Sequence, residues 1–218
     1  MASLLNGHQV SFRICYGGTF DPVHDGHIAV AVFAQKSFDA DVYFIPSADP
    51  PHRQKPLATA RQRADMLQIA IDNQPRFFLD TRELQRAKPS YTVDTLRQLR
   101  AEIGHEIPVA WLIGADAFAQ LHTWHEWEAL FDLAHFIVAV RPGYSMQSPH
   151  FPFNERLSDS LDPLKASPAG RIFSLQCPPQ RESASAIREA FSAGEAPVGL
   201  NPAVHAYILE HGLYPKAL

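Results

Sequence analysis

Near its beginning the chain reads Gly17-Gly18-Thr19-Phe20-Asp21-Pro22-Val23-His24-Asp25-Gly26-His27. The segment before it, residues 12–16, has the apolar composition of a β-strand, and residues 28–38 after it read as a helix. Two adjacent glycines favour a tight turn and a close approach of the backbone to a ligand. A strand that turns directly into a helix is the first unit of an α/β fold.

The rest of the chain continues this alternation of strands and helices. Helix 59–72 begins with a capping box, because Gln62 follows Thr59 at the required spacing. The apolar runs predict strands at residues 41–45, 77–79, 109–113, 136–140 and 171–175, and helices at 59–72, 91–103, 184–193 and 202–210. The pattern predicts one Rossmann-like α/β domain over residues 1–218, with a mostly parallel sheet, helices on both faces and ligands beyond the carboxyl ends of the strands.

One segment departs from the alternation. Residues 141–169 are rich in proline and serine and show little periodicity. We expect a long, mobile surface insertion between two strands.

Composition excludes several classes of function. The 218 residues carry 19 Lys and Arg against 23 Asp and Glu, a net charge of -4, which argues against a protein that mainly binds nucleic-acid backbone. No apolar run approaches the roughly 18 residues of a membrane span, and residues 1–10 lack the pattern of a signal peptide. Two cysteines, Cys15 and Cys177, are too few for a disulfide scaffold, so we expect buried thiols and a cytoplasmic protein. No feature predicts an oligomeric state.

The first motif has the chemistry of a phosphate site. A helix start presents free N–H groups and the positive end of its dipole. His24 and His27 are spaced to lie on one side of the first helical turn, where two imidazoles can bind a polyphosphate. A metal site is the alternative, although zinc helices favour histidines four residues apart and no third ligand is near in sequence.

Two later segments could add to this site. Ser183 or Ser185 can cap the helix at 184–193, and Arg188 in its first turn can bind phosphate oxygens with two N–H groups. Gly114 and Asp116 follow the buried strand at 109–113. A carboxylate there can hold a ribose hydroxyl, help to seat a cation, or simply cap the next helix.

Aromatic and basic residues suggest the borders of a second pocket. Trp124 begins a segment with helical spacing and can lie at a pocket edge, whereas Trp127 reads as a core residue. His52, Arg53 and Lys55 form a basic cluster after the strand at 41–45. It is either a solvated loop or a phosphate clamp.

The motif resembles the signature of the nucleotidylyltransferase superfamily, Gly-x-Thr/Ser-Phe-Asp-Pro-x-His-x-Gly-His. More closely, nearly the whole chain resembles the bacterial nicotinate-nucleotide adenylyltransferase family. The resemblance rests on the order and spacing of short pieces: Pro50-Pro51-His52-Arg53, Pro89-Ser90-Tyr91-Thr92, Ile113-Gly114-Ala115-Asp116, Thr123-Trp124, Arg141-Pro142-Gly143, Ser183-Ala184-Ser185-Ala186-Ile187-Arg188 and Gly212-Leu213-Tyr214.

The resemblance implies transfer of AMP from ATP to nicotinate mononucleotide, giving nicotinate adenine dinucleotide and pyrophosphate, with Mg²⁺ carried by ATP. It implies catalytic roles for His24, His27 and Arg188. It places ATP against Gly17, Gly18, Thr19, Phe20, Gly114, Asp116, Ser185 and Ile187, and the mononucleotide against Arg53, Tyr91, Thr92 and Trp124. Trp124 would stack on the pyridine ring, and the backbone N–H groups of Tyr91 and Thr92 would face the nicotinate carboxylate. No dedicated metal site is implied, and Asp21 is the nearby carboxylate that could contact a metal.

The chain departs from the family pattern Ile-Ser-x-Thr-x-x-Arg at two positions. Ser185 keeps the hydroxyl of the usual threonine, whereas Glu182 replaces an isoleucine and brings the local packing into question. Two alternatives remain open. The acceptor could be that of another superfamily enzyme, such as nicotinamide mononucleotide, phosphopantetheine or a cytidylyltransferase substrate, or the chain could be a nucleotide-binding module without activity.

Overall fold

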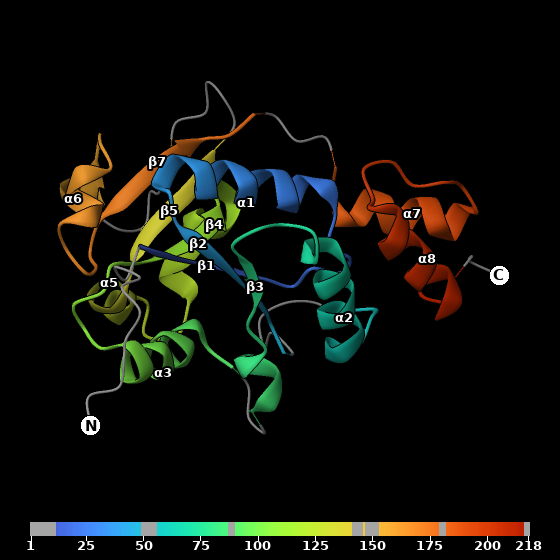
Figure 1. Cartoon of the computed structure of the whole chain (residues 1–218), viewed down its shortest axis with the longest axis horizontal. Coiled ribbons are helices and arrows are strands. Elements are labelled where there is room, and N and C mark those ends of the chain that lie inside the picture. The colour runs from blue at the N-terminus through green and yellow to red at the C-terminus, as the bar shows by residue number, and fades with distance from the viewer. Residues whose placement is uncertain are drawn as a thin grey trace, which may run out of the picture.

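A computed structural model describes residues 12–48, 56–86, 90–140, 146, 153–178 and 182–215. Its centre is a seven-stranded sheet with the strand order β3-β2-β1-β4-β5-β7-β6, in which every pair of neighbours is parallel (Figure 1). The strands are β1 (Arg13–Gly18), β2 (Asp41–Pro46), β3 (Phe77–Leu79), β4 (Val109–Gly114), β5 (His135–Val140), β6 (Leu157–Ser158) and β7 (Ile172–Gln176). The predicted parallel α/β sheet is confirmed.

The helices lie on both sides of this sheet, as the alternation predicts. They are α1 (Asp25–Phe38), α2 (Ala60–Ile71), α3 (Thr92–Ile103), α4 (Ala115–Ala119), α5 (Leu130–Leu133), α6 (Asp162–Lys165), α7 (Ala184–Ala193) and α8 (Pro202–Glu210). Short 3-10 turns add η1 (Arg82–Gln85), η2 (Leu121–Thr123), η3 (Trp127–Ala129) and η4 (Asn154–Arg156). The capping box of Thr59 and Gln62 starts α2 as expected.

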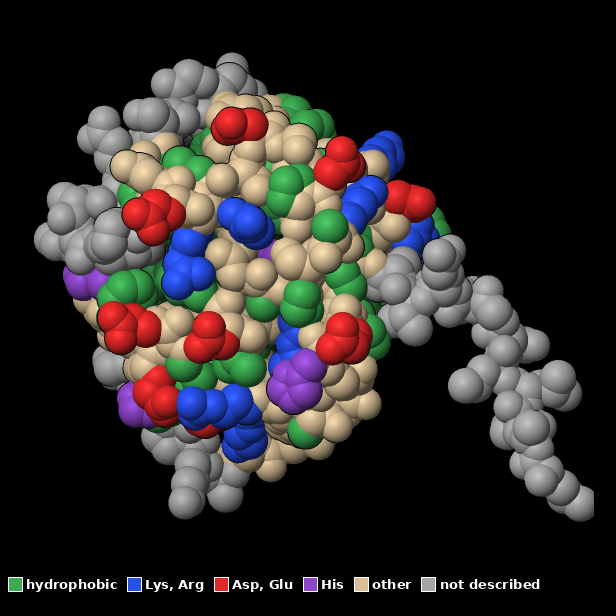
Figure 2. Space-filling view, turned by 90° about the vertical axis from the view of Figure 1, so that its left-hand side faces the viewer, with side chains coloured by type: hydrophobic (Ala, Val, Ile, Leu, Met, Phe, Trp, Pro, Cys, Tyr) green, Lys and Arg blue, Asp and Glu red, His purple; other side chains and the backbone are tan. Residues whose placement is uncertain are grey.

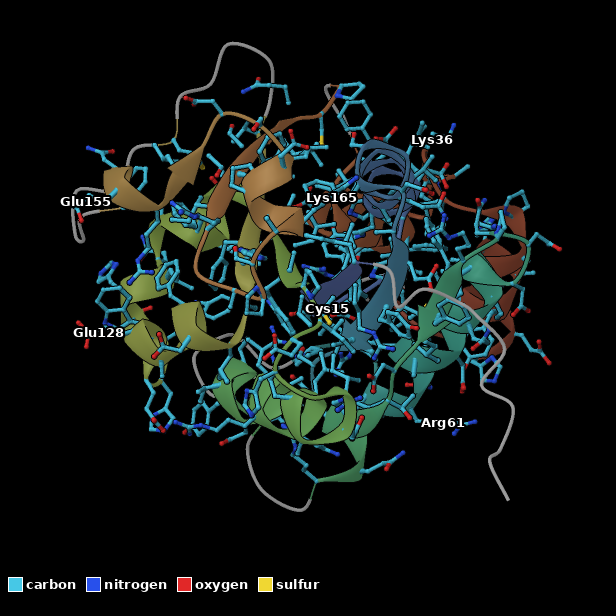
Figure 3. All side chains as sticks on the ribbon, turned by 60° about the vertical axis from the view of Figure 1, so that its left-hand side comes forward. Cys15, Lys36, Arg61, Glu128, Glu155 and Lys165 are labelled. Carbon is cyan, nitrogen blue, oxygen red and sulfur yellow. The ribbon has the colours of Figure 1, made fainter. Side chains whose placement is uncertain are left out.

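Two hydrophobic clusters form the core, one on each face of the sheet. Ile14 of β1 packs with residues of α1, α2, α6 and α8, whereas the next residue, Cys15, packs with residues of α3, α4 and α5. This alternation is that of a strand buried on both faces. Cys15 lies inside the molecule, while Glu128 and Glu155 lie at its outline (Figure 3). Cys15 and Cys177 are both buried free thiols, as predicted.

The segment 141–169 is more ordered than the sequence suggests in the part that the structure describes. Residues 141–145 and 147–152 lie outside the described residues. Beyond them, β6 pairs with β7 at the edge of the sheet, and Leu164 of α6 is fully buried in the core. Residues 153–169 therefore contribute a strand and a helix to the fold, and the mobility of the insertion stays a prediction. Its weak periodicity reflects elements too short to produce an apolar repeat.

The strand order identifies where a ligand should bind. The chain moves outward from β1 to β2 and β3 on one side, then crosses back to continue from β4 on the other side. The carboxyl ends of β1 and β4 therefore flank the topological switch point, where open α/β sheets bind their ligands. The first motif follows β1, and Gly114 ends β4. Both predicted nucleotide segments thus border the switch point.

Charged side chains of both signs are interspersed on the face shown in Figure 2, which is the left-hand side of Figure 1.

Among the described residues, no helix has both the length and the apolar composition of a membrane span.

Candidate active site

The two histidines of the first motif come together at the start of α1. His24 is the N-cap residue and His27 lies in the first turn, so their ring centroids are 3.8 Å apart. The backbone N–H of His24 donates to Nδ1 of His27 at 3.3 Å. We infer that the neutral His27 ring carries its proton on Nε2. Nδ1 of His24 is buried and has no hydrogen-bond partner among the described residues. The predicted pairing of the imidazoles is confirmed, and the pair retains a polar atom for a ligand.

Both imidazoles are neutral in the free protein. Burial, against a smaller opposing effect of the Glu182 charge, lowers the pKa of His24 to about 4. Burial, with a smaller contribution from His24, lowers the pKa of His27 well below its usual range. Adding a positive charge here is unfavourable without a negative ligand. A bound polyphosphate would supply that charge, and its binding would then be coupled to protonation of the pair.

The glycines of the motif do not form the tight turn that the sequence suggested. Gly17 and Gly18 are the last residues of β1, and neither has a positive φ. A Cβ atom on Gly17 would lie 2.1 Å from the Trp111 ring, and one on Gly18 would lie 2.8 Å from the Phe20 ring. The turn itself falls at Phe20, whose φ is 51°. The glycines are therefore required because aromatic rings occupy the space of their side chains.

Phe20 packs against His27 of the histidine pair. Its buried ring meets the His27 ring edge-on, with centroids 5.0 Å apart, and also packs against Tyr16. Only the backbone of Phe20 can therefore face a nucleotide. Its contact with ATP, like those of Gly17, Gly18 and Thr19, remains a prediction.

The start of α7 reaches the first motif, as the two predicted phosphate segments require. Arg188 donates from Nη1 to the backbone carbonyl of Asp21 at 2.6 Å and from Nη2 to Oγ of Ser185 at 3.3 Å. Ser183, rather than Ser185, caps the helix, because its Oγ accepts the N–H of Ala186. Arg188 and the exposed hydroxyl of Ser185 are thus held beside the histidine motif.

Asp21 has a structural environment rather than that of a metal ligand. Its buried carboxylate accepts the N–H of Leu57 at 2.9 Å, the N–H of Ala58 at 3.1 Å and the hydroxyl of Tyr214 at 2.7 Å. These bonds occupy both oxygens and join the motif to α2 and to the end of the chain. No group of three or more metal-ligating side chains occurs in the described ranges. The possible metal contact of Asp21 therefore gains no support from its geometry.

The other predicted ATP residues differ in what they present. Gly114 is the N-cap of α4, and Asp116 in the first turn of that helix is exposed at the carboxyl end of β4. Asp116 is therefore accessible to a ligand at the switch point. Ile187, in contrast, is buried, and its N–H donates to Ser183 within α7. Ile187 presents no polar side chain, and its assignment to ATP remains a prediction.

The predicted pyridine pocket is partly assembled. Tyr91 is the N-cap of α3, directly before Thr92, and its ring lies 4.4 Å from that of His125, the neighbour of Trp124. The start of α3 and the Trp124 segment are therefore adjacent. Trp124 follows η2, so this segment consists of short turns instead of the continuous helix that the spacing suggested. Trp127 is only partly buried, so it is a core-edge residue.

The predicted basic cluster cannot be compared with the structure. His52, Arg53 and Lys55 lie outside the described residues. Glu182 is described, and it packs over Gly199: a Cβ there would lie 2.0 Å from Cγ of Glu182. Gly199 accepts the N–H of Asp25 at the start of α1, and its φ is +76°. A glycine therefore makes room for the glutamate that departs from the family pattern.

One buried residue at this edge of the sheet was missed. Arg63 of α2 has no exposed surface and bonds to the motif carbonyl of Thr19. The available signal was its position on the apolar face of the helix, three and four residues before Met66 and Leu67. A cation at such a position needs polar partners.

A parallel sheet with a paired-histidine motif at its switch point is the arrangement expected of a nucleotidyltransferase, and the relatives of this chain belong to that class. The family model described as "Cytidylyltransferase-like" matches residues 15–190. The chain is 51% identical to the "Probable nicotinate-nucleotide adenylyltransferase" of Stenotrophomonas maltophilia (strain K279a), covering 94% of this chain and 98% of the relative. It is 42% identical to the protein of that name from Pectobacterium atrosepticum, covering 94% and 99%.

Among solved structures, the chain resembles a Plasmodium falciparum nicotinic acid mononucleotide adenylyltransferase complexed with NaAD. The TM-score is 0.67 at 20% identity, over 93% of this chain and 97% of the other, which demonstrates a shared fold. The chain belongs to the cytidylyltransferase-like family and, within it, to the nicotinate-nucleotide adenylyltransferases.

Proposed function

We propose that this enzyme transfers AMP from ATP to nicotinate mononucleotide, releasing nicotinate adenine dinucleotide and pyrophosphate. The observation that carries the proposal is the convergence at the switch point: the adjacent rings of His24 and His27, with centroids 3.8 Å apart, and Arg188 bonded to the same motif at 2.6 Å. The names of relatives at 42–51% identity supply the acceptor. A complex of the Plasmodium enzyme with NaAD is consistent with this choice.

The reaction requires positioning and charge stabilisation, and no protein nucleophile. An oxygen of the mononucleotide phosphate forms a bond to the α-phosphorus of ATP, and the bond from that phosphorus to the bridging oxygen breaks. The electron pair leaves with pyrophosphate. His24, His27, Arg188 and Ser185 would stabilise the charge on the leaving phosphates, together with the N–H groups at the start of α1.

The acceptor would bind between the start of α3 and the Trp124 segment. Tyr91 and Thr92 offer the N–H groups of a helix start to an anionic carboxylate. Trp124 offers an aromatic surface to the pyridine ring. ATP would arrive as its magnesium complex, with the ion held by phosphate oxygens and water. We also propose that the enzyme works in the cytoplasm, where its two buried thiols would stay reduced.

A competition among acceptors tests this function. The purified enzyme is given magnesium-ATP with nicotinate mononucleotide, nicotinamide mononucleotide or phosphopantetheine, and both released pyrophosphate and the mass of the product are measured. We expect a strong preference for nicotinate mononucleotide and a product of the mass of nicotinate adenine dinucleotide. Activity with another acceptor alone would refute the proposed pocket. ATP binding without pyrophosphate release from any acceptor would favour a nucleotide-binding module.

A further inference from the structure

A buried guanidinium connects three segments at the carboxyl edge of the sheet. Arg63 donates to the carbonyls of Thr19 at 2.6 Å, Ser47 at 2.7 Å, Ala48 at 2.5 Å and Ala58 at 3.4 Å. Its neighbour Arg61, in contrast, points outward from α2 (Figure 3) and is paired with Asp65 on the surface. The interior position of Arg63 therefore depends on these carbonyls.

The carbonyls belong to the segments that would border the substrates. Thr19 is in the motif that follows β1, and Ser47 and Ala48 follow β2. The N–H of Ser47 also donates to the carbonyl of Gly18 at 2.9 Å. Because the guanidinium is a rigid planar fork, it sets the separation of these segments.

Ala48 is held from its other side as well. Its backbone N–H faces the buried carboxylate of Glu83 and favours the ionised form of that group, and the same carboxylate accepts the Thr95 hydroxyl at 2.7 Å. Thr95 is in the first turn of α3, beside Tyr91 and Thr92. A continuous series of polar contacts thus runs from the motif through Arg63, Ala48 and Glu83 to the start of α3.

We propose that Arg63 is a positioning residue of the transfer reaction. It fixes the loop after β1, which would hold the ATP phosphates, against the loop after β2 and, through Ala48 and Glu83, against the helix that would hold the acceptor. Arg63 touches no substrate and acts through the carbonyls that it binds. This inference rests on the proposed function for its choice of substrates.

The chain contains a matched control for a purely structural role. Arg100 is also buried and donates to four backbone carbonyls, those of Leu133, Gly104, Ile107 and Pro168. These carbonyls precede β4, β5 and β7, at the amino ends of the strands, whereas Arg63 lies at the carboxyl ends. Arg100 and Arg63 should therefore stabilise the fold similarly, while only Arg63 lies beside the candidate active site.

The test compares Arg63→Lys with Arg100→Lys. Lysine keeps the charge, but its point-like ammonium cannot reach all four carbonyls on the three segments. Each variant is assayed below its own melting temperature for kcat and for the KM of both substrates. The affinity for a non-hydrolysable ATP analogue is measured by calorimetry. We expect both variants to lose thermal stability. In Arg63→Lys, kcat/KM should fall at least about tenfold for both substrates, because small misplacements of reacting groups have large effects on rate.

Arg100→Lys should keep kcat/KM and analogue affinity within about twofold of the parent, given the distance between the two edges. Equal losses of activity in the two folded variants, or parental kinetics in Arg63→Lys, would overturn the proposal. If the parent itself fails to adenylylate nicotinate mononucleotide, the proposed function fails. Analogue affinity then decides the role of Arg63: weakened binding in Arg63→Lys alone supports it, and unchanged binding overturns it.

Discussion

ATP binding at pH 7 should bring about half a proton or more onto the pair of His24 and His27. The pKa of His24 is about 4 in the free protein, because the residue is buried, with only 8% of its surface exposed. At pH 7 about one molecule in a thousand is therefore protonated there, and raising the pKa to 7 requires about 4 kcal/mol. A single phosphate charge about 4 Å away contributes about 4 kcal/mol at an effective dielectric constant of 20. One phosphate contact is thus sufficient to raise the pKa of His24 to about 7.

The sign of the pH dependence follows from this shift. The bound pKa lies above the free pKa, so ATP binding takes up a proton between the two values. Affinity should therefore strengthen as the pH falls from the bound pKa toward the free pKa of about 4, and this contribution should level off above the bound pKa. The titratable groups that face His24 are His27, on the same helix turn, and Glu182, before α7. The negative charge of Glu182 favours the protonated form of His24.

Calorimetry with a non-hydrolysable ATP analogue measures the uptake directly. Titrations at pH 7 with saturating Mg²⁺, in buffers of different ionisation enthalpy, give the number of protons bound. His24→Gln should reduce the uptake substantially. His135→Gln is the control, because burial also lowers the pKa of His135 to about 4, at the opposite edge of the sheet. Tight binding by the parent without proton uptake would refute the reasoning and leave the imidazoles as neutral hydrogen-bond donors.

Two stability changes follow from contacts around the motif and are measured by urea unfolding. Gly199→Ala should lower the free energy of unfolding by about 3 kcal/mol, because the φ of residue 199 is +76° and the new Cβ would lie 2.0 Å from Glu182. Gly212 has a φ of +58° and open space around it, so Gly212→Ala should lower the free energy of unfolding by only about 1 kcal/mol. Adding Glu182→Ala to Gly199→Ala removes the clashing side chain, so the double variant should also lose about 1 kcal/mol. Equal losses in the two single variants would exclude the clash. Tyr214→Phe should lower the free energy of unfolding by about 1–2 kcal/mol, because it removes a buried hydrogen bond to Asp21. Tyr207→Phe removes a more exposed hydrogen bond to Asp65 and should change stability little. A larger loss in Tyr207→Phe would contradict the structural role of the Tyr214 bond.

Local signals predicted the parts of the fold that depend on neighbouring residues. The capping box at Thr59 and the apolar repeat of α2 concern residues a few positions apart, so the sequence displays them. The pairing of His24 with His27 is of the same kind. The helix there begins at Asp25, earlier than the apolar run at 28–38 indicates, because His24 serves as its N-cap.

Contacts between distant segments were beyond such signals. The hydroxyl of Tyr214 reaches Asp21 across nearly the whole chain, so the carboxylate that the sequence suggested as a metal contact proved to be a link within the fold. The sequence predicted that Gly17 is needed for a tight turn. It is needed instead because the ring of Trp111, on the neighbouring strand, occupies the space of a side chain. Tertiary packing decides both cases.

The most direct test of the account is the turnover number of His27→Ala with magnesium-ATP and nicotinate mononucleotide. The account predicts a loss of at least about a hundredfold in kcat, the scale expected when a group that stabilises transition-state charge is removed. The variant should retain a cooperative thermal transition, which shows that the loss is not one of folding. Turnover near that of the parent, in a folded variant, would contradict the claim that the imidazole pair at the start of α1 stabilises the departing phosphates.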